Sequence, residues 1–177
     1  PYQGFAGQGD VVTVGEEKNQ AVILVGYGQG MTGYEAHAII RDLHELESWQ
    51  VMPIRLVLGK FYDIDFMCLY IPSFGALPHT LIWYPPGTDA TGQRAIASLV
   101  DTRDQIILSQ KEAERACCNG VFVQHNGSIT IVMHNPDIIL TSQLRERGYK
   151  VIEQPTYEFL KNGGSLRCLS LLIRRYV

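Results

Sequence analysis

Short runs of aliphatic and β-branched residues alternate along the chain with longer segments in which apolar residues recur every three or four positions. The short runs are bounded by Gly, Pro, Asn or Asp, which is typical of strands. The longer spacing predicts amphipathic helices. Two strands, a helix and a further strand follow one another three times, and this order predicts a repeating architecture.

In the first repeat, strands are predicted over 9–14, 21–25 and 51–58. Thr32 and Glu35 have the spacing of a capping box, which predicts that a helix begins there. The residues expected to face the core from this helix are Ala36, Ile39, Ile40, Leu43 and Leu46.

In the second repeat, strands are predicted over 64–71, 80–84 and 105–108. A helix is expected to follow Asp89, a good N-cap residue. Its predicted inward positions are Ala95, Ile96 and Leu99.

The third repeat begins with a short helix from Ser109, which has a capping-box partner in Glu112. Strands are predicted over 120–124, 128–133 and 150–153, and the first two are joined by a turn containing Asn-Gly. The last helix is expected to be capped by Asn135, to have Pro136 in its first position and to end at Gly148. Its predicted inward residues are Ile138, Ile139 and Leu144.

The pattern predicts an α/β (α+β) fold made of three ββαβ units, approximately 1–58, 59–108 and 109–177. Units of this size cannot bury their sheets alone, so we expect them to pack around a shared axis.

Composition narrows the function classes. Of the 177 residues 46% are hydrophobic, and the net charge is −3, which argues against nucleic acid as a partner. No apolar run approaches the roughly 18 residues of a membrane span, and His and Cys do not cluster at zinc spacing, so neither a membrane nor a metal or cofactor is expected. Cys68, Cys117 and Cys118 are expected to be reduced and buried, which favours a cytoplasmic protein.

Cys168 is the first candidate for chemistry. It follows Gly163, Gly164 and Ser165, where glycine allows the backbone to approach a ligand closely. The neighbouring Arg167 is a cation that would favour the thiolate. On the residues alone, a buried structural thiol is the alternative.

Two acidic segments are the other candidates. In Phe61-Tyr62-Asp63-Ile64-Asp65, strand alternation would place Asp63 and Asp65 on one side, where a bound guanidinium would relieve their repulsion. A solvated strand edge is the alternative. In the segment 5–10, the glycines predict a tight bend, and Asp10 would either cap it or meet a ligand.

Together these segments resemble the guanidino-group-modifying enzymes of the pentein superfamily, which includes amidinotransferases, arginine deiminases and dimethylarginine dimethylaminohydrolases. The run Asn162-Gly-Gly-Ser-Leu-Arg-Cys-Leu169 is similar to their nucleophile segment. The segment 61–65 resembles their aromatic-aromatic-His-Leu-Asp strand, 7–10 resembles their Gly-rich segment ending in Asp, and 116–119 resembles an Ala-Cys-Asn stretch.

This resemblance implies a five-bladed α/β propeller and covalent catalysis at a guanidino carbon. Cys168 would be the nucleophile, and water or an acceptor amine would resolve the thiouronium intermediate, giving a hydrolase or an amidinotransferase. Asp65 would hold the guanidinium of an arginine-like substrate. The resemblance extends substrate contacts to Asp10, Arg167, Gly164, Ser165 and Asn119.

Two residues depart from the family pattern. Asp63 occupies the position of the family's histidine and could replace it only with a raised pKa. The family's acidic residue three positions before Asp10 is Gly7 here. None of the five histidines lies in a matching motif, and His125 and His134, beside a hairpin, are expected at the surface.

The third departure is length, since three units are fewer than five. The chain starts at Pro1, so we expect either a processed or truncated piece of a longer chain or a three-unit form that associates, as a homo-oligomer, to cover its edges. Three hypotheses follow. They are a cysteine-dependent enzyme, a catalytically impaired guanidine binder on the same scaffold, and a scaffold-only relative, against which the Cys168 segment argues.

Overall fold

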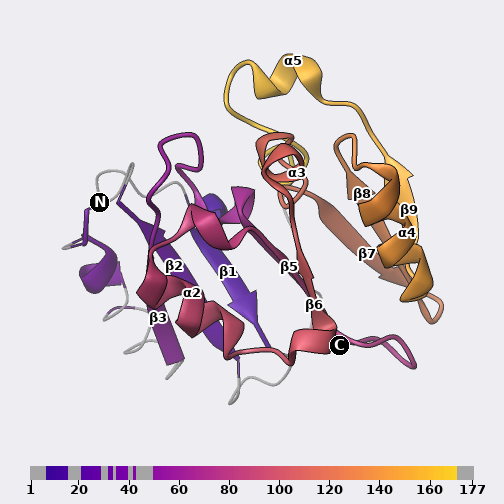
Figure 1. The fold of residues 1–177 in the computed structure, drawn as a ribbon, viewed down its shortest axis with the longest axis horizontal. Helices are drawn as coiled ribbons and strands as arrows, with labels where there is room; N and C mark the ends of the chain where they lie inside the picture. Colours follow the sequence, from indigo (N-terminus) through magenta and orange to yellow (C-terminus); the bar gives the residue numbers. More distant parts are fainter. Residues whose placement is uncertain are drawn as a thin grey trace.

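The computed structural model describes residues 7–15, 21–28, 32, 33, 35–39, 42 and 50–170. In this part of the chain there are three mixed sheets, each of three strands, and they follow one another across the molecule in chain order (Figure 1). The sheets comprise β1 (Val11–Val14), β2 (Val22–Tyr27) and β3 (Gln50–Arg55); β4 (Cys68–Ile71), β5 (Thr80–Trp83) and β6 (Gln105–Ile107); and β7 (Val121–His125), β8 (Ser128–Met133) and β9 (Lys150–Glu153).

All three sheets have the same topology. The middle strand pairs antiparallel with the strand before it and parallel with the strand after it. A parallel pair requires a crossover, which contains α2 (Ala90–Ala97) in the second sheet and α4 (Ile138–Glu146) in the third. In the first crossover, residues 33, 35–39 and 42 are helical. The predicted ββαβ order is therefore confirmed for all three sheets.

The predicted helix starts are confirmed in three cases. Glu35 N–H donates to Thr32 Oγ1 and Thr32 N–H to Glu35 Oε2, the reciprocal bonds of a capping box. Asp89 accepts from two backbone N–H groups at the start of α2. The short α3 (Gln110–Glu114) begins with the predicted capping box.

The last helix begins later than predicted. Asn135 has a φ of +43° and does not cap α4; Asp137 does, by accepting from Leu140 N–H. Ile138 and Ile139 are 81% and 65% exposed, so the prediction that they face inward is wrong. Leu140 and Leu144 are buried instead, and Gly148 ends the helix with a φ of +89°, as expected.

The segment 64–71 is also different from the prediction. Residues Ile64–Phe66 form a turn of 3-10 helix (η2), and β4 begins only at Cys68. The turn buries Ile64, Asp65 and Phe66 together, which strand alternation could not do. Asp63 and Asp65 therefore do not lie side by side along a strand.

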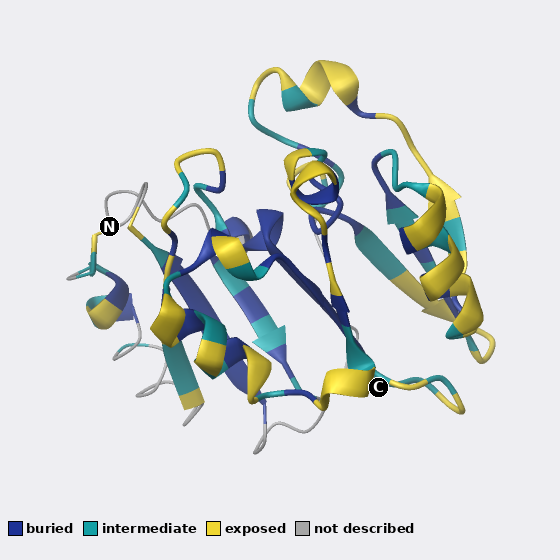
Figure 2. Cartoon of the chain, viewed as in Figure 1, coloured by how far each residue is buried: buried dark blue, intermediate teal, exposed yellow. Residues whose placement is uncertain are grey.

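Buried aliphatic and aromatic side chains join the second and third sheets and much of the first into one core (Figure 2). Of the predicted inward residues, Ala36, Ile39 and Ile96 are buried, whereas Ala95 and Leu99 are half-buried against the core. Ile40, Leu43 and Leu46 lie outside the described residues.

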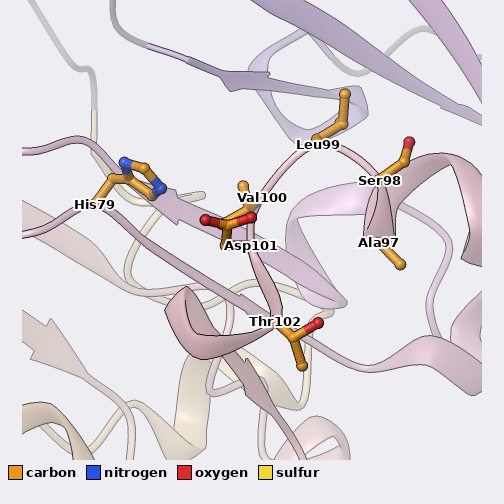
Figure 3. Close-up of a pocket in the computed structure, with 7 residues that line it drawn as sticks. All are labelled: His79, Ala97, Ser98, Leu99, Val100, Asp101 and Thr102. Atoms are coloured by element: carbon orange, nitrogen blue, oxygen red, sulfur yellow. The ribbon is translucent and has the colours of Figure 1, made fainter.

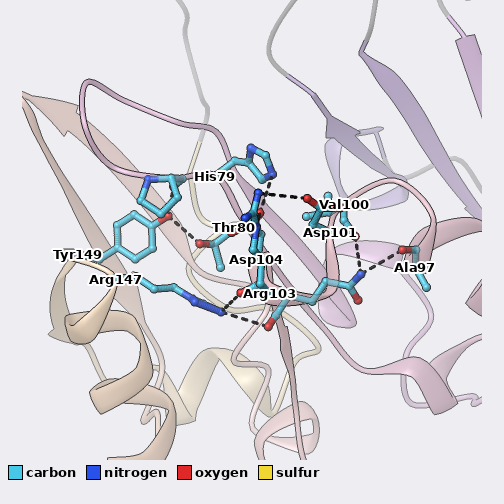
Figure 4. Close-up of polar contacts among 11 residues, drawn as sticks. His79, Thr80, Ala97, Val100, Asp101, Arg103, Asp104, Arg147 and Tyr149 are labelled. Carbon is cyan, nitrogen blue, oxygen red and sulfur yellow. Dashed lines mark hydrogen bonds and ion pairs between the residues drawn. The ribbon is translucent and has the colours of Figure 1, made fainter.

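A polar seam joins the second and third sheets (Figure 4). Arg147, after α4, donates to the carbonyl oxygens of Arg103 and Gln105 at 2.9 and 3.2 Å. Tyr149 donates its hydroxyl to the Pro78 carbonyl at 2.6 Å and lies 2.8 Å from Thr80 Oγ1. These bonds fix the relative position of the second and third units, which carry Asp65 and Cys168.

Two short elements flank the sheets: α5 (Tyr157–Leu160) follows β9, and η1 (Gly7–Asp10) precedes β1. Two further 3-10 turns, η3 (Pro85–Gly87) and η4 (Thr102–Asp104), lie in the second unit. Among the described helices none is long and apolar enough to cross a membrane.

Candidate active site

After α5 the chain turns back and brings residues 161–170 against the end of α3. Arg167 N–H donates to the backbone carbonyl of Asn119 at 3.1 Å, which anchors this loop. Gly164 N–H donates to the Phe159 carbonyl, and a Cβ added to Gly164 would lie 3.5 Å from Cys168 Cβ. Cys168 itself is exposed, so its thiol is accessible to a substrate.

Asn119 is buried and holds the candidate nucleophile through its side chain. Its amide donates to Cys168 Sγ at 3.3 Å. Its Oδ1 accepts from the backbone N–H groups of Arg167 and Cys168 at 3.2 and 3.4 Å. The Asn119 side chain therefore fixes the position of both the sulfur and the backbone of Cys168.

Arg167 points away from solvent. Its Nε lies 3.4 Å from Asp65 Oδ2, and its Nη2 donates to the Val11 carbonyl at 3.1 Å. The residue preceding the thiol therefore ties the loop to β1 and η2. Asp65 and the Arg167 guanidinium are therefore close enough to form an ion pair.

Asp65 is fully buried, and among the described residues no hydrogen bond of ordinary geometry reaches either of its oxygens. Burial raises the pKa of Asp65 to about 7, with smaller increases from Asp63 and Asp10; Arg167 and the Asn119 amide act in the opposite direction. A buried acceptor of this kind is available to a cation that enters the site.

Asp63 and Asp10 form a pair of carboxyl groups near Asp65. Asp63 is half-buried at the start of η2, and Asp10, at the end of η1, is 2% exposed. The two carboxyl groups lie within hydrogen-bonding reach of each other. Burial raises the pKa of Asp63, and the proximity of Asp10 offsets part of this increase. The sequence predicts Asp65 as the acidic neighbour of Asp63. In the structure Asp10 is a further acidic neighbour of Asp63.

Tyr62 is a residue that sequence reasoning missed. Its phenol is close enough to Asp63, Cys168 and Asp65 for all three to act on it, and burial together with these groups raises the pKa of Tyr62 to about 12. A Cβ on Gly163 would lie 2.8 Å from the Tyr62 hydroxyl oxygen, and Gly163 has a φ of +83°. The sequence feature that could have indicated Tyr62 is Gly163, because only glycine leaves room for the Tyr62 hydroxyl there.

A buried hydrogen-bond chain supports the loop from the other side. Ser165 is fully buried, and its hydroxyl lies 2.9 Å from Thr156 Oγ1. Thr156 N–H donates to His134 Nδ1 at 2.7 Å. His134 is 2% exposed, so its predicted surface position is wrong, whereas His125 is exposed as expected. Ser165 thus braces the loop three residues before Cys168.

The other three cysteines are free and buried, as predicted. Burial raises the pKa of Cys68 and of Cys117 to about 12 and that of Cys118 well above its ordinary value. Of the four thiols, only Cys168 is accessible.

Comparison with known proteins finds relatives in the family that the sequence motifs resemble. No family model matches the chain. It is 31% identical over 169 residues to a bifunctional arginine dihydrolase/ornithine cyclodeaminase, ArgZ, of Synechocystis sp.. It is 29% identical over 167 residues to an N(G),N(G)-dimethylarginine dimethylaminohydrolase of Mycobacterium tuberculosis. The substrate-bound N-terminal domain of ArgZ superposes with a TM-score of 0.76 at 30% identity, over 94% of this chain. The chain belongs to the pentein superfamily.

This pentein chain covers only part of its relatives. It spans 22% of the Synechocystis protein, 49% of the M. tuberculosis protein and 56% of the ArgZ N-terminal domain. A dimethylarginine dimethylaminohydrolase from Pseudomonas aeruginosa, at 19% identity and a TM-score of 0.58, shares the fold.

A separate hollow of about 480 Å³ lies at the end of α2 (Figure 3). It is lined by His79 and residues 97–102, and none of the predicted site residues of this pentein chain borders it. The residues proposed for chemistry lie elsewhere, where η1, η2, Asn119 and the Cys168 loop meet.

Proposed function

We propose that this protein modifies the guanidino group of arginine or an arginine-like compound, with Cys168 as the nucleophile. The observation that carries the proposal is that the Asn119 side chain donates to the accessible Cys168 thiol, while Arg167, the residue before it, forms an ion pair with the buried Asp65. The thiolate would attack the trigonal guanidino carbon and form a covalent thiouronium intermediate.

The relatives support this reaction class. ArgZ is an arginine dihydrolase, and its N-terminal domain has been solved with substrate, with product and covalently bonded to a reaction intermediate. The M. tuberculosis relative acts on dimethylarginine. Hydrolysis is accordingly our first proposal. Amidinotransfer would use the same intermediate with an amine in place of water.

We assign Asp65 to the substrate guanidinium. A carboxylate and a guanidinium form paired, charge-assisted hydrogen bonds. Arg167 occupies one side of Asp65, through Oδ2, so the substrate would bind toward Oδ1, which no described residue reaches with a hydrogen bond of ordinary geometry. Gly164, beside Cys168, leaves room for a substrate there. Ser165 acts from within the protein by bracing the loop.

A second candidate is a guanidine-binding protein with impaired catalysis. It is favoured by two sequence positions: Asp63 stands where the family has its histidine, and Gly7 stands where it has an acidic residue. Binding would need only Asp65 and its neighbours, whereas turnover needs a proton carrier.

We further propose that the three units are part of a five-unit propeller, completed either by further residues of a longer chain or by a second copy in a homo-oligomer. The exposed apolar residues on the third unit, among them Val123 on β7 and Ile152 on β9, are consistent with such covering. Neither a metal nor a cofactor is needed by the proposed reaction. A cytoplasmic location remains our expectation from the reduced cysteines.

The test is turnover of arginine, agmatine and methylarginines, measured as ammonia or amine released and as the ureido product formed. We expect release with at least one of these compounds, and none with Cys168→Ser. Wild type that binds a guanidine without turnover, and gains turnover in Asp63→His, would support the impaired binder. No binding and no turnover with any guanidine contradicts both candidates.

A further inference from the structure

A thiouronium mechanism has to deliver a proton to the leaving amine and remove one from water. This chain has Asp63 where its family resemblance places a histidine. We infer that Asp63 and Asp10 hold one proton between them and that this carboxyl pair carries the proton of the reaction. The inference rests on the proposed function and names the acid–base group of the same site.

The backbone at Gly9 sets the position of Asp63. A Cβ on residue 9 would lie 2.6 Å from Asp63 Oδ2 and 3.2 Å from its Cγ. Any side chain at residue 9 would therefore displace this carboxyl group. Glycine at residue 9 lets η1 approach η2 closely enough to bring Asp10 next to Asp63.

The contact between the two side chains requires a proton. An ionised carboxylate only accepts hydrogen bonds, so two carboxyl groups can share one only if one of them keeps its proton. Asp63 and Asp10 lie within hydrogen-bonding reach of each other, residue 9 packs directly against Asp63 Oδ2, and Asp10 is 2% exposed. Burial disfavours a second negative charge at this pair, in the same direction as the raised pKa of Asp63.

The charged and titratable groups around Asp63 come from three segments. Asp10 faces it from η1, Tyr62 and Asp65 from its own segment, and Arg167 and Cys168 belong to the nucleophile loop. The Asp65 carboxylate, when ionised, further disfavours full ionisation of the pair. Among the described residues, His, Cys, Asp and Glu side chains do not gather into a set of three or more able to hold a metal ion.

The pair supplies what the reaction needs at each step. Cys168, as the thiolate, adds to the guanidino carbon and forms the C–S bond. The shared proton passes to the leaving nitrogen as its C–N bond breaks, and the pair becomes doubly ionised. Water then adds to the thiouronium carbon and returns a proton to the pair. When the C–S bond breaks, the thiolate is restored, and the remaining hydroxyl proton leaves with the released amine, as an ammonium ion.

Two readouts separate this role from a structural one. The first is isotope-edited infrared spectroscopy of protein labelled with ¹³C at the Asp carboxyl carbons, at pH 7. A protonated-carboxyl band is expected in wild type, and Asp65→Asn identifies the part that belongs to Asp65. The remaining band should be lost both in Asp63→Asn and in Asp10→Asn, because the new amide N–H lets the remaining carboxyl group ionise. Asp101→Asn, at a 73% exposed side chain, is the control and should change nothing.

The second readout is the pH profile of turnover with a guanidine that wild type processes. Asp63→Asn should lower kcat by at least about 100-fold with little change in KM, and should abolish the alkaline limb that loss of the shared proton produces. Wild type without a protonated-carboxyl band other than that of Asp65, or a band that survives both substitutions, contradicts the pair. A band that behaves as expected in a protein that processes no guanidine upholds the pair and contradicts the proposed reaction instead.

Discussion

The Asn119 amide donates to the sulfur of Cys168 across 3.3 Å, while its carbonyl oxygen accepts from the backbone N–H of Cys168 at 3.4 Å. A single buried side chain thus fixes both the sulfur and the backbone of the candidate nucleophile. This relationship joins the segment after α3 to the loop after α5, and it explains why a thiol on an exposed loop has a defined position.

Asn119→Ala removes this donor. A neutral hydrogen bond contributes about 1 kcal/mol, so alkylation of Cys168 by iodoacetamide at pH 7 should slow by about 5- to 10-fold. The measurement is the rate of mass increase of the peptide that contains Cys168. Gln124→Ala, at an exposed position on β7, should react at the wild-type rate. An unchanged rate in Asn119→Ala would mean that the amide does not hold the sulfur in its reactive position.

Asp65 should make the protein less stable as the pH rises. Its pKa is about 7 in the folded state, above the ordinary value of 3.8, so the folded state binds the proton more tightly than the unfolded state. This contribution is fully present below about pH 4 and is lost as the pH rises through 7. Between pH 5 and 8, the free energy of unfolding should fall by about 2–4 kcal/mol from this group.

Asp65→Asn should flatten that dependence. The measurement is urea unfolding at pH 5, 6, 7 and 8, compared with Asp101→Asn as an exposed control. If the two variants show the same pH dependence, Asp65 does not titrate as its environment indicates.

His134 should act in the opposite direction. Thr156 N–H donates to its Nδ1, which requires the neutral ring, and burial lowers the pKa of His134. A folded-state pKa below the unfolded value gives a contribution that is present above about pH 6.5 and lost as the pH falls. We expect His134→Ala to cost about 1–3 kcal/mol at pH 7.5 and less at pH 5.

The matched control for His134 is His125→Ala, at the exposed end of β7. Both variants are compared by urea unfolding at the two pH values. A loss in His134→Ala that is equal at pH 5 and pH 7.5 would mean that the bond to Thr156 does not depend on the neutral ring.

Gly163 and Tyr62 should be energetically coupled. Gly163→Ala introduces a side chain at a φ of +83° and places it 2.8 Å from the Tyr62 oxygen, so it should cost more than the roughly 1 kcal/mol of backbone strain alone. Tyr62→Phe removes that oxygen and should recover the excess in the double variant. Gly127→Ala, at a φ of +73° with nothing within 4 Å, is the control for strain alone and should not respond to Tyr62→Phe. The free energies of unfolding of the single and double variants decide this.

Local chemistry made most of the fold predictable. Capping pairs such as Ser109 with Glu112 act over one turn of helix, and the Asn-Gly turn acts over one hairpin, so a sequence window contains both partners. The start of α4 was misplaced because both Asn135 and Asp137 are good caps, and only the burial of Leu140 and Leu144 decides between them.

The site was predictable in part. The nucleophile segment and the two acidic segments were found from their motifs, and the structure places Asp65 against Arg167 beside Cys168. The environment of Asp63 could not be found this way, because its partner Asp10 lies 53 residues earlier and η2 replaces the expected strand. The bond from Thr156 to His134, two residues 22 positions apart, is likewise a tertiary contact without a local signal.

The central claim is a covalent intermediate on Cys168, and acid quenching during reaction with arginine, agmatine or a methylarginine tests it most directly. The account predicts that, within the time of one turnover, intact mass and peptide mapping find an amidino-type adduct on Cys168, and that Cys168→Ser forms none. If the protein binds these guanidines and no quench time gives an adduct on Cys168, or if the adduct persists in Cys168→Ser, the account of Cys168 as the nucleophile is contradicted.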